Sequence, residues 1–250
     1  MKAIILAAGQ GTRLKPLTDA IPKCLVPFRG KPILDHILFA LHETGIADIT
    51  VVTGYRDDAV VARGIPTRHN PEFASTNMVR SLFCAEDLLE GDDVLVVYGD
   101  IVFRSALAHA LSQERAPISV AVNTQWRELW QLRMSDPLAD AETLKLDAKG
   151  NIVELGKKAR SYEEIQGQYT GLIRIAREAL PRVRAFYHAL DQTRLYDGKN
   201  FHNMFMTSFL QEIIDHLMPI KAVLVGGGWV EIDSIEDLLA YEKLPEGFFA

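Results

Sequence analysis

Residues 1–14, MKAIILAAGQGTRL, carry the strongest structural signal in this chain. Its opening run MKAII predicts a buried first strand of an α/β sheet. The small residues and two glycines that follow let the backbone approach a bulky anion, and their N–H groups can point at phosphate oxygens. We therefore expect a phosphate-binding loop built from Leu6, Ala7, Ala8, Gly9, Gly11, Thr12 and Arg13.

Two cations accompany this loop. Arg13 presents a rigid guanidinium fork that matches phosphate geometry, and Lys23 follows shortly afterwards. A Walker A loop needs Gly-Lys-Ser/Thr, but Gly11 is followed by threonine and arginine. A dinucleotide fingerprint needs a third glycine where this chain has Leu14. The pattern predicts a triphosphate site of another kind, and an ordinary glycine-rich turn is the alternative.

Length and composition favour one globular α/β domain. The 250 residues are 48% hydrophobic and 24% charged, with no clear linker or internal repeat. We expect a single domain over residues 1–250, with a nucleotide-binding half at 1–117 and an acceptor-binding half, partly inserted, at 118–250. This division rests on the regular first part and the irregular second part of the chain.

Charge and cysteine content exclude several classes of protein. The formal net charge of −6 argues against a general binder of nucleic acid or anionic membranes. The chain contains no apolar run long enough for a transmembrane helix, which predicts no membrane insertion. Cys24 and Cys84 are too few for a disulfide framework and predict reduced thiols in a cytoplasmic protein. The oligomeric state is left open, a homo-oligomer included.

Strands and helices alternate in the first hundred residues. Strands at 49–52 and 94–98 and helices at 32–43 and 77–89 predict right-handed βαβ units and a mostly parallel central sheet flanked by helices. Ligands of such sheets bind outside the carboxyl ends of the strands. Gly9, Gly54 and Asp100 fall at that edge, so three segments are expected to meet in one site.

The second half is less regular. It predicts strands at 118–122, 152–155, 169–175 and 222–225, and helices at 177–190, 201–217 and 235–241, the last capped by Ser234.

Three carboxylates are candidates for a metal site. Asp100 ends the strand at 94–98, where it would repel a triphosphate unless a divalent cation lay between them. Mg²⁺ is typically held by one or two carboxylates together with phosphate oxygens. Glu231 and Asp233 lie two apart on an extended segment and therefore share a face. We expect Mg²⁺ bound by Asp100 with one or both of the others; a turn-capping aspartate and a solvated strand end are the alternatives.

Three motifs together resemble a known family. LAAGQGTRL at 6–14 followed by Lys23 is similar to the signature of nucleotidyltransferases, which join an NTP to a phosphorylated small molecule. YGD at 98–100 resembles the metal-binding segment of that family, and WVEIDS at 229–234 resembles its choline-phosphate cytidylyltransferase branch. The resemblance implies a Rossmann-like, GT-A-like fold, a Mg²⁺ cofactor, and release of pyrophosphate by in-line attack on the α-phosphate.

The same resemblance suggests the nucleotide. HNPEFASTNMVRSL at 69–82 is similar to the NP…TNNIYSL stretch of bacterial phosphocholine cytidylyltransferases, with Met78 and Arg80 as departures. It implies CTP, or another NTP, as substrate. The matching residues that would bind the nucleotide are Asn70, Thr76, Asn77 and Ser81.

The residues that would bind the acceptor are indicated by weaker sequence signals than those that would bind the nucleotide. Trp126 and Trp130 are spaced to share one helix face and would either cage an acceptor ammonium by cation–π attraction or pack the core. Lys157 and Lys158 follow a segment resembling one in which a lysine meets the acceptor phosphate; a solvated surface is the alternative. Tyr169 and Gly171 are candidates for shaping the acceptor pocket.

Two other functions compete. A sugar-1-phosphate nucleotidyltransferase using UTP or dTTP is one, although such enzymes usually carry Asp-x-Gly where this chain has Glu-Ile-Asp at 231–233. A catalytically silent nucleotide-binding regulator is the other. The presence of both phosphate-binding cations and both metal-binding carboxylates argues against a regulator, which does not need all of them. These residues are Arg13, Lys23, Asp100 and Asp233.

Overall fold

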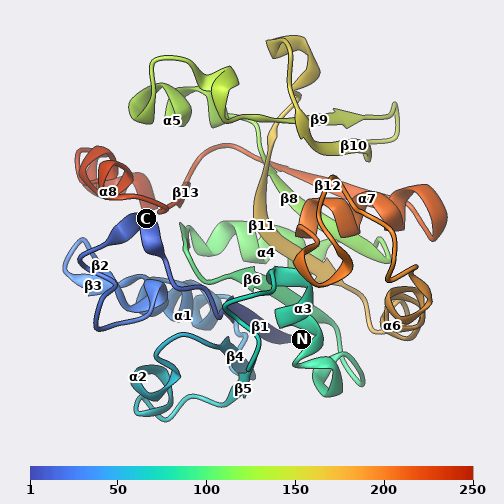
Figure 1. Ribbon diagram of the computed structural model, residues 1–250. Helices are drawn as coiled ribbons and strands as arrows, with labels where there is room; N and C mark the ends of the chain where they lie inside the picture. Colours follow the sequence, from blue (N-terminus) through green and yellow to red (C-terminus); the bar gives the residue numbers. More distant parts are fainter. Residues whose placement is uncertain (250) are drawn as a thin grey trace.

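The computed structural model describes residues 1–249 and is organised around a nine-stranded sheet (Figure 1). In spatial order its strands are β5 (Thr67–His69), β4 (Ile49–Thr53), β1 (Lys2–Ala7), β6 (Val94–Tyr98), β11 (Gln168–Ile175), β8 (Ile118–Asn123), β12 (Ile220–Val225), β10 (Asn151–Lys158) and β9 (Glu142–Leu146).

The sheet is mostly parallel, as predicted. β1 pairs in parallel with β4 and β6, and β8 pairs in parallel with β12. β11 and β10 run in the opposite direction to their neighbours. Because the buried strands β1, β4 and β6 are apolar on both faces, helices must cover both sides of the sheet.

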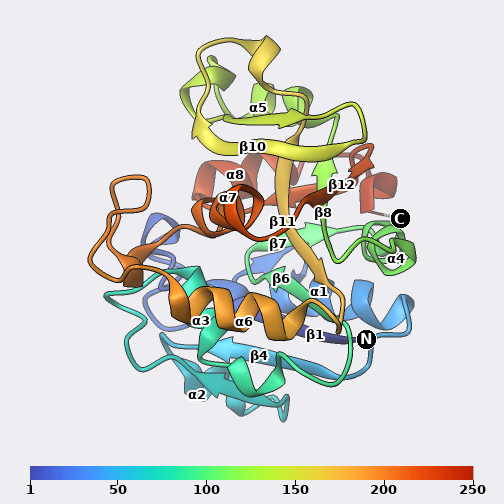
Figure 2. The same cartoon turned by 90° about the vertical axis from the view of Figure 1, so that its right-hand side faces the viewer.

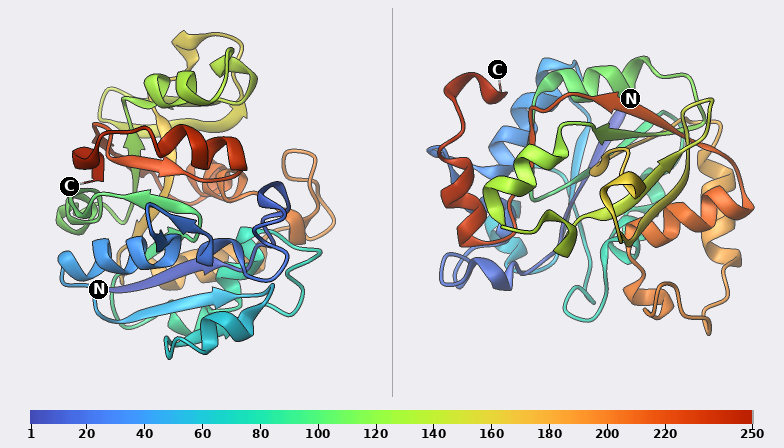
Figure 3. Two further views of the ribbon diagram at one scale, coloured as in Figure 1. Left: turned by 90° about the vertical axis from the view of Figure 1, so that its left-hand side faces the viewer. Right: turned by 90° about the horizontal axis from the view of Figure 1, so that it is seen from above.

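Helices occupy both faces. Those of four residues or more in α-helical conformation are α1 (Ile33–Glu43), α2 (Asp57–Val61), α3 (Met78–Phe83), α4 (Ser105–Gln113), α5 (Trp126–Arg133), α6 (Leu180–Ala189), α7 (Met206–His216) and α8 (Ile235–Tyr241). α1 and α4 pack together on one face, and α3, α6 and α7 cover the other (Figure 3). α5 lies with β9 and β10 at one end of the molecule (Figure 2).

Three predicted helices are shorter than expected. The predicted helix at 177–190 is α6, which begins at Leu180, next to Pro181, and ends at Ala189. The predicted helix at 77–89 ends as α3 at Phe83 and continues as a separate 3-10 turn, Glu86–Leu88. The predicted helix at 201–217 begins only at Met206, after a 3-10 turn at Phe201–Asn203 whose Asn200 side chain caps it. In these last two segments a 3-10 turn separates residues whose apolar pattern predicted one continuous helix.

Two short ribbons complete the fold. β2 (Pro27–Phe28) pairs with β3 (Lys31–Pro32), and β7 (Ile101–Phe103) pairs with β13 (Trp229–Glu231). Of the helices in residues 1–249, none is long and apolar enough to cross a lipid bilayer.

Candidate active site

The β7–β13 ribbon brings the three candidate carboxylates together. Ile101 pairs with Glu231 in antiparallel register, and the Ile232 N–H donates to the Asp100 carbonyl at 2.9 Å. Carboxylate oxygens of Asp100, Glu231 and Asp233 consequently lie within 4.8 Å of one another. Residues more than 130 positions apart in sequence thus form one acidic cluster through a ribbon that the sequence analysis did not predict.

Lys23 lies between two of these carboxylates. Its Nζ donates to Asp100 Oδ2 at 2.7 Å and to Asp233 Oδ1 at 2.5 Å. Arg13 approaches from outside, with Nη2 3.0 Å from Asp233 Oδ2 and a side chain that is 67% exposed. The two cations predicted at the phosphate loop therefore meet the predicted carboxylates directly.

The cluster is electrostatically uneven. Burial raises the pKa of Glu231 well above its usual value, and the neighbouring charges of Asp233 and Asp100 raise it further. Burial alone would raise the pKa of Asp233 too, but Lys23 and Arg13 outweigh it and hold that pKa below its usual value. Asp100 Oδ1 is buried and has no hydrogen-bond partner within residues 1–249.

An all-oxygen donor set of this kind suits a hard divalent cation. The unpartnered Asp100 Oδ1 is the more specific sign, because buried polar atoms are nearly always satisfied. The residues present therefore fit a metal ion held by Asp100, Glu231 and Asp233.

The phosphate loop owes its shape to its glycines. Gly11 has φ +66°, and a Cβ there would lie 2.9 Å from Lys23 Cβ. Thr18 Oγ1 donates to the Gly11 carbonyl at 2.8 Å and fixes the turn. The 3-10 turn Thr12–Leu14 follows at once and leaves Arg13 facing outward.

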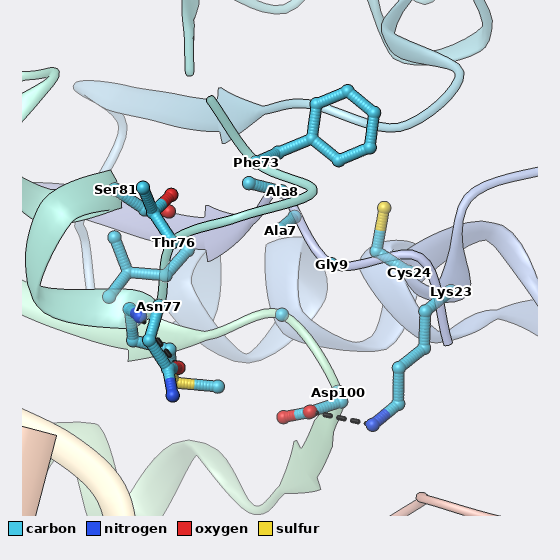
Figure 4. A pocket seen from close by; sticks show the side chains of 13 residues that line it. Ala7, Ala8, Gly9, Lys23, Cys24, Phe73, Thr76, Asn77, Ser81 and Asp100 are labelled. Atoms are coloured by element: carbon cyan, nitrogen blue, oxygen red, sulfur yellow. Dashed lines mark hydrogen bonds and ion pairs between the residues drawn. The ribbon is translucent and has the colours of Figure 1, made fainter. Parts of the chain in front are cut away.

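A small cavity of about 110 Å³ lies beside the loop (Figure 4). Its lining residues are Leu6, Ala7, Ala8, Gly9, Lys23, Cys24, Phe73, Thr76, Asn77, Met78, Ser81, Gly99 and Asp100. Figure 4 shows the Lys23–Asp100 pair at one end of the cavity and Ser81 at the other. The small cavity is therefore bounded by the phosphate loop, by the Lys23–Asp100 pair and by the start of α3.

Asn70 and Gly54 are not among the lining residues of this cavity, but they contact residues that line it. Asn70 is fully buried and donates to Thr76 and Ser81, so it shapes the wall from outside. Gly54 packs so tightly that a Cβ would lie 2.5 Å from Phe73 Cβ. Phe73 and Cys24 line the cavity but were missed, since neither belongs to the glycine-rich loop.

A larger cavity of about 500 Å³ opens from the same point. It shares Lys23 and Asp100 with the small cavity. On the side away from the phosphate loop its lining residues are Tyr98, Trp130, Asp140, Glu142, Gln168, Tyr169, Thr170, Gly171, Phe205, Met206, Thr207 and Trp229. The acidic cluster therefore lies at the junction of two cavities.

This arrangement can be compared with known proteins. The sequence profile of the MobA-like NTP transferase domain family matches residues 3–197. The chain is a nucleotidyltransferase of that family. The family that the sequence motifs resemble is thereby confirmed.

Relatives of the transferase align over almost its whole length. It is 44% identical to "CTP:phosphoglutamine cytidylyltransferase" of Campylobacter jejuni, covering 95% of this chain and 98% of that protein. It is 38% identical to "Choline-phosphate cytidylyltransferase" of Streptococcus pneumoniae, covering 98% and 97%. The solved inositol-1-phosphate CTP transferase of T. maritima superposes with a TM-score of 0.73 at 24% identity, covering 98% and 96% of the two chains, and supports the fold.

The two tryptophans of the transferase have different surroundings. Trp130 lines the large cavity, stacks on Trp229 with ring centroids 6.2 Å apart, and donates to Asp140 Oδ2 at 3.0 Å. Trp126 is buried and makes an edge contact with Trp130. One ring of the predicted pair thus faces the cavity and the other supports it; Trp229 was noted only as part of a motif.

Tyr169 and Gly171 lie in the wall of the same cavity. Gly171 has φ +77°, and a Cβ there would lie 2.6 Å from the ring of Tyr98. The ladder between β11 and β8 shifts register between Tyr169 and Ile173. This irregularity makes room for Tyr98, whose ring meets that of Tyr169 edge-on at 5.6 Å.

Lys157 and Lys158 have other partners. Lys157 Nζ forms an ion pair with Asp197. Lys158 Nζ donates to the carbonyls of Leu138 and Ala139 at 2.8 and 2.6 Å, next to Asp140. Neither side chain is among the described residues that line the two cavities.

Proposed function

We propose that the transferase joins CTP to a small phosphorylated or phosphonate acceptor and releases pyrophosphate. The observation that carries this proposal is the meeting of two cavities at Asp100, one small and one large, beside a phosphate loop with two cations. A closed cavity of roughly 150 Å³ accommodates a benzene ring. The small cavity, at about 110 Å³, is smaller, so it would enclose a single-ring pyrimidine only in part and a two-ring purine even less. The names of the two aligned relatives support CTP.

The chemistry needs no general base. The acceptor phosphate is already ionised, and one of its oxygens attacks the α-phosphorus in line. A new P–O bond forms as the bond to the bridging oxygen breaks, and the electron pair leaves with pyrophosphate. Catalysis then depends on positioning and on stabilisation of charge.

Lys23 and Arg13 would stabilise the departing pyrophosphate, since both reach the junction of the cavities. Backbone N–H groups of the loop from Leu6 to Thr12 would hold the phosphates. Thr76, Asn77 and Ser81, which line the small cavity, would contact the nucleoside. Residues 1–117 would thus supply most of the nucleotide site, and residues 118–250 most of the acceptor site.

Mg²⁺ is the metal we propose at the acidic cluster. Asp100, Glu231 and Asp233 would hold it, and when bound it would neutralise charge on the phosphate oxygens. We further propose a cytoplasmic location, in keeping with the free thiols of Cys24 and Cys84.

The far wall of the large cavity favours an acceptor with a positive charge. Asp140 and Glu142 line it beside the ring of Trp130, and the lining cations Arg13 and Lys23 belong to the phosphate side. Phosphocholine-like compounds, aminoethylphosphonate and phosphorylated amino acids have this chemistry. If Lys157 or Lys158 binds the acceptor phosphate, the ammonium group of that lysine must first leave its present partners.

Pyrophosphate release tests the proposal. The enzyme would be assayed with Mg²⁺ and each of CTP, UTP, dTTP, ATP and GTP against phosphocholine, aminoethylphosphonate, phosphorylated amino acids and glucose-1-phosphate. We expect turnover with CTP and an amine-bearing acceptor, and none in Asp100→Asn. Preference for a sugar phosphate with UTP or dTTP would overturn the proposal.

A further inference from the structure

The side chain of Asp237, on α8, holds the backbone that carries Asp233. Its Oδ2 accepts hydrogen bonds from the N–H groups of Asp233 and Ser234, each at 2.9 Å. Ser234 Oγ in turn accepts from the Asp237 N–H at 3.2 Å. The turn between β13 and α8 is therefore fixed directly at one of the three carboxylates of the acidic cluster.

Arg133, on α5, fixes the carboxylate of Asp237. The Nε of Arg133 donates to Asp237 Oδ1 at 2.6 Å, and its Nη2 donates to Oδ2 at 3.4 Å. Only 8% of the arginine side chain and 4% of the aspartate side chain are exposed. Because a guanidinium is a rigid fork and the pair is shielded from water, the carboxylate is held in one orientation.

Arg133 also lies next to the wall of the large cavity. Its guanidinium is 5.5 Å from the ring centroid of Trp130, and its Nη1 is 3.9 Å from Asp140 Oδ2. Trp130 and Asp140 line that cavity. The chain of contacts from Arg133 through Asp237 to Asp233 therefore joins the acceptor side of the molecule to the acidic cluster.

We propose that Asp237 and Arg133 are positioning residues for the metal, because they hold Asp233 where its carboxylate can reach the ion. The inference rests on the proposed function, since it needs the divalent cation proposed at the acidic cluster. Within residues 1–249, neither side chain lines one of the two cavities, so both would act through Asp233. Replacing a residue that orients a metal ligand from outside typically costs about 10–100-fold in metal affinity.

Asp237→Asn tests the inference. An amide has one acceptor oxygen, so the new side chain can serve either Arg133 or the two backbone N–H groups, but not both. We would measure the Kd for Mn²⁺ and Mg²⁺ by calorimetry on the folded full chain without nucleotide. We expect Kd to rise about 10–100-fold, and the Mg²⁺ concentration that gives half the maximal rate of pyrophosphate release to rise with it.

Two variants of Arg133 provide a graded test. Arg133→Met removes the cation beside Asp237, and we expect it to weaken Mn²⁺ binding by about the same 10–100-fold. Arg133→Lys keeps a cation there but loses the fork, so it should weaken binding less. Equal weakening by methionine and lysine would show that the charge beside Asp237 does not position the ligand.

Asp93→Asn is the matched control. Asp93 also accepts from a buried arginine, Arg174 Nη2 at 2.6 Å, and from a backbone N–H, that of Arg177 at 2.9 Å. It precedes the first residue of β6, whereas Asp100 lies beyond the last. Asp93→Asn should lower Tm, as Asp237→Asn does, but leave the Kd for Mn²⁺ unchanged.

Two results would overturn the inference: a Kd for Mn²⁺ in Asp237→Asn equal to that of the wild type, or an equal loss of affinity in Asp93→Asn. Either would show that the Arg133–Asp237 pair serves stability alone. If Asp237→Asn fails to fold, the two variants of Arg133 decide by the same measurement. A wild-type protein that binds neither Mn²⁺ nor Mg²⁺ would overturn the proposed metal site as well, so the two failures are distinguishable.

Discussion

Lys23 Nζ lies 2.7 Å from Asp100 Oδ2, so an ammonium of the chain itself lies among the carboxylates expected to hold a metal. The same Nζ reaches Asp233. Burial alone would lower the pKa of Lys23, but the three carboxylates outweigh it and keep the group charged. A divalent cation and this ammonium must compete for the same oxygens, so binding of metal and movement of Lys23 toward the nucleotide phosphates are expected to be linked.

Lys23→Met should therefore bind divalent cations more tightly in the absence of nucleotide. We expect about a tenfold gain in affinity, equivalent to about 1.4 kcal/mol, measured by calorimetry with Mg²⁺ and Mn²⁺. In chelator the variant should be destabilised, because buried carboxylates lose their partner, and added metal should restore its Tm. Its kcat should nevertheless fall.

Lys15→Met is the control for this change. Lys15 pairs with Asp19 at the surface, outside the acidic cluster. It should alter neither metal affinity nor the response of Tm to metal. Equal metal affinity in Lys23→Met and the wild type would show that Lys23 does not compete with the ion.

Arg13→Ala should lower kcat as well as raise KM for the nucleotide. The Arg13 side chain contacts Asp233 at the junction of the cavities and is otherwise exposed, so little stability is at stake. Loss of one donor that stabilises developing charge in an oxyanion hole costs roughly 10²–10³-fold in kcat, and we expect a loss of about that order here. Steady-state kinetics would decide, and a change confined to KM would assign Arg13 to ground-state binding alone.

Gly11→Ala should cost activity beyond its cost in stability. At φ +66° an alanine loses about 1–2 kcal/mol, and its Cβ would also press on Lys23 at 2.9 Å. Gly64→Ala is matched, because Gly64 has φ +73° with nothing within 4 Å. Urea unfolding should show destabilisation of both, larger in Gly11→Ala because of the close contact with Lys23, whereas nucleotide turnover should fall only in Gly11→Ala. Equal activity in the two variants would contradict a role of the loop in holding Lys23.

Much of the site was predictable because its signals are local. The glycines of the phosphate loop and the strand that precedes Asp100 can each be recognised from about ten consecutive residues of sequence. The β7–β13 ribbon has no such local signal. β7 has only three residues, and its role in the site depends on the pairing of Ile101 with Glu231, which is distant in sequence. The convergence of Asp100 with Asp233 could therefore be expected from their charge and from the family resemblance, but not from periodicity.

The acceptor side was less predictable for a related reason. Helical spacing puts Trp126 and Trp130 on one face, but it does not say which ring points toward a cavity. That outcome depends on Trp229, which reaches Trp130 from the other end of the chain. Lys157 and Lys158 are adjacent in sequence, yet β10 directs their ammonium groups to different partners.

Lys158→Met separates two roles for that side chain. Its ammonium holds the Leu138 and Ala139 carbonyls, which precede Asp140 in the wall of the large cavity. We expect a several-fold rise in acceptor KM with kcat unchanged, because only positioning is lost. A fall in kcat at saturating acceptor would instead show that Lys158 reaches the acceptor phosphate during turnover.

Trp130→Phe should weaken the acceptor specifically. Phenylalanine keeps most of the stacking on Trp229 but loses the hydrogen bond to Asp140, which is 3.0 Å long. Asp140 would then be less well oriented toward a cationic acceptor, and acceptor KM should rise about 5–10-fold, in line with about 1 kcal/mol for one hydrogen bond. KM for CTP should not change.

Trp126→Phe provides the comparison, since Trp126 lies behind Trp130 and away from the cavity lining. It should lower Tm through lost packing while leaving acceptor KM nearly unchanged. The test is completed by kinetics with two phosphate acceptors, one that carries a choline-type ammonium group and one that has no positively charged group. If Trp130→Phe affected both acceptors equally, the Trp130–Asp140 pair would serve the shape of the cavity and not the recognition of positive charge.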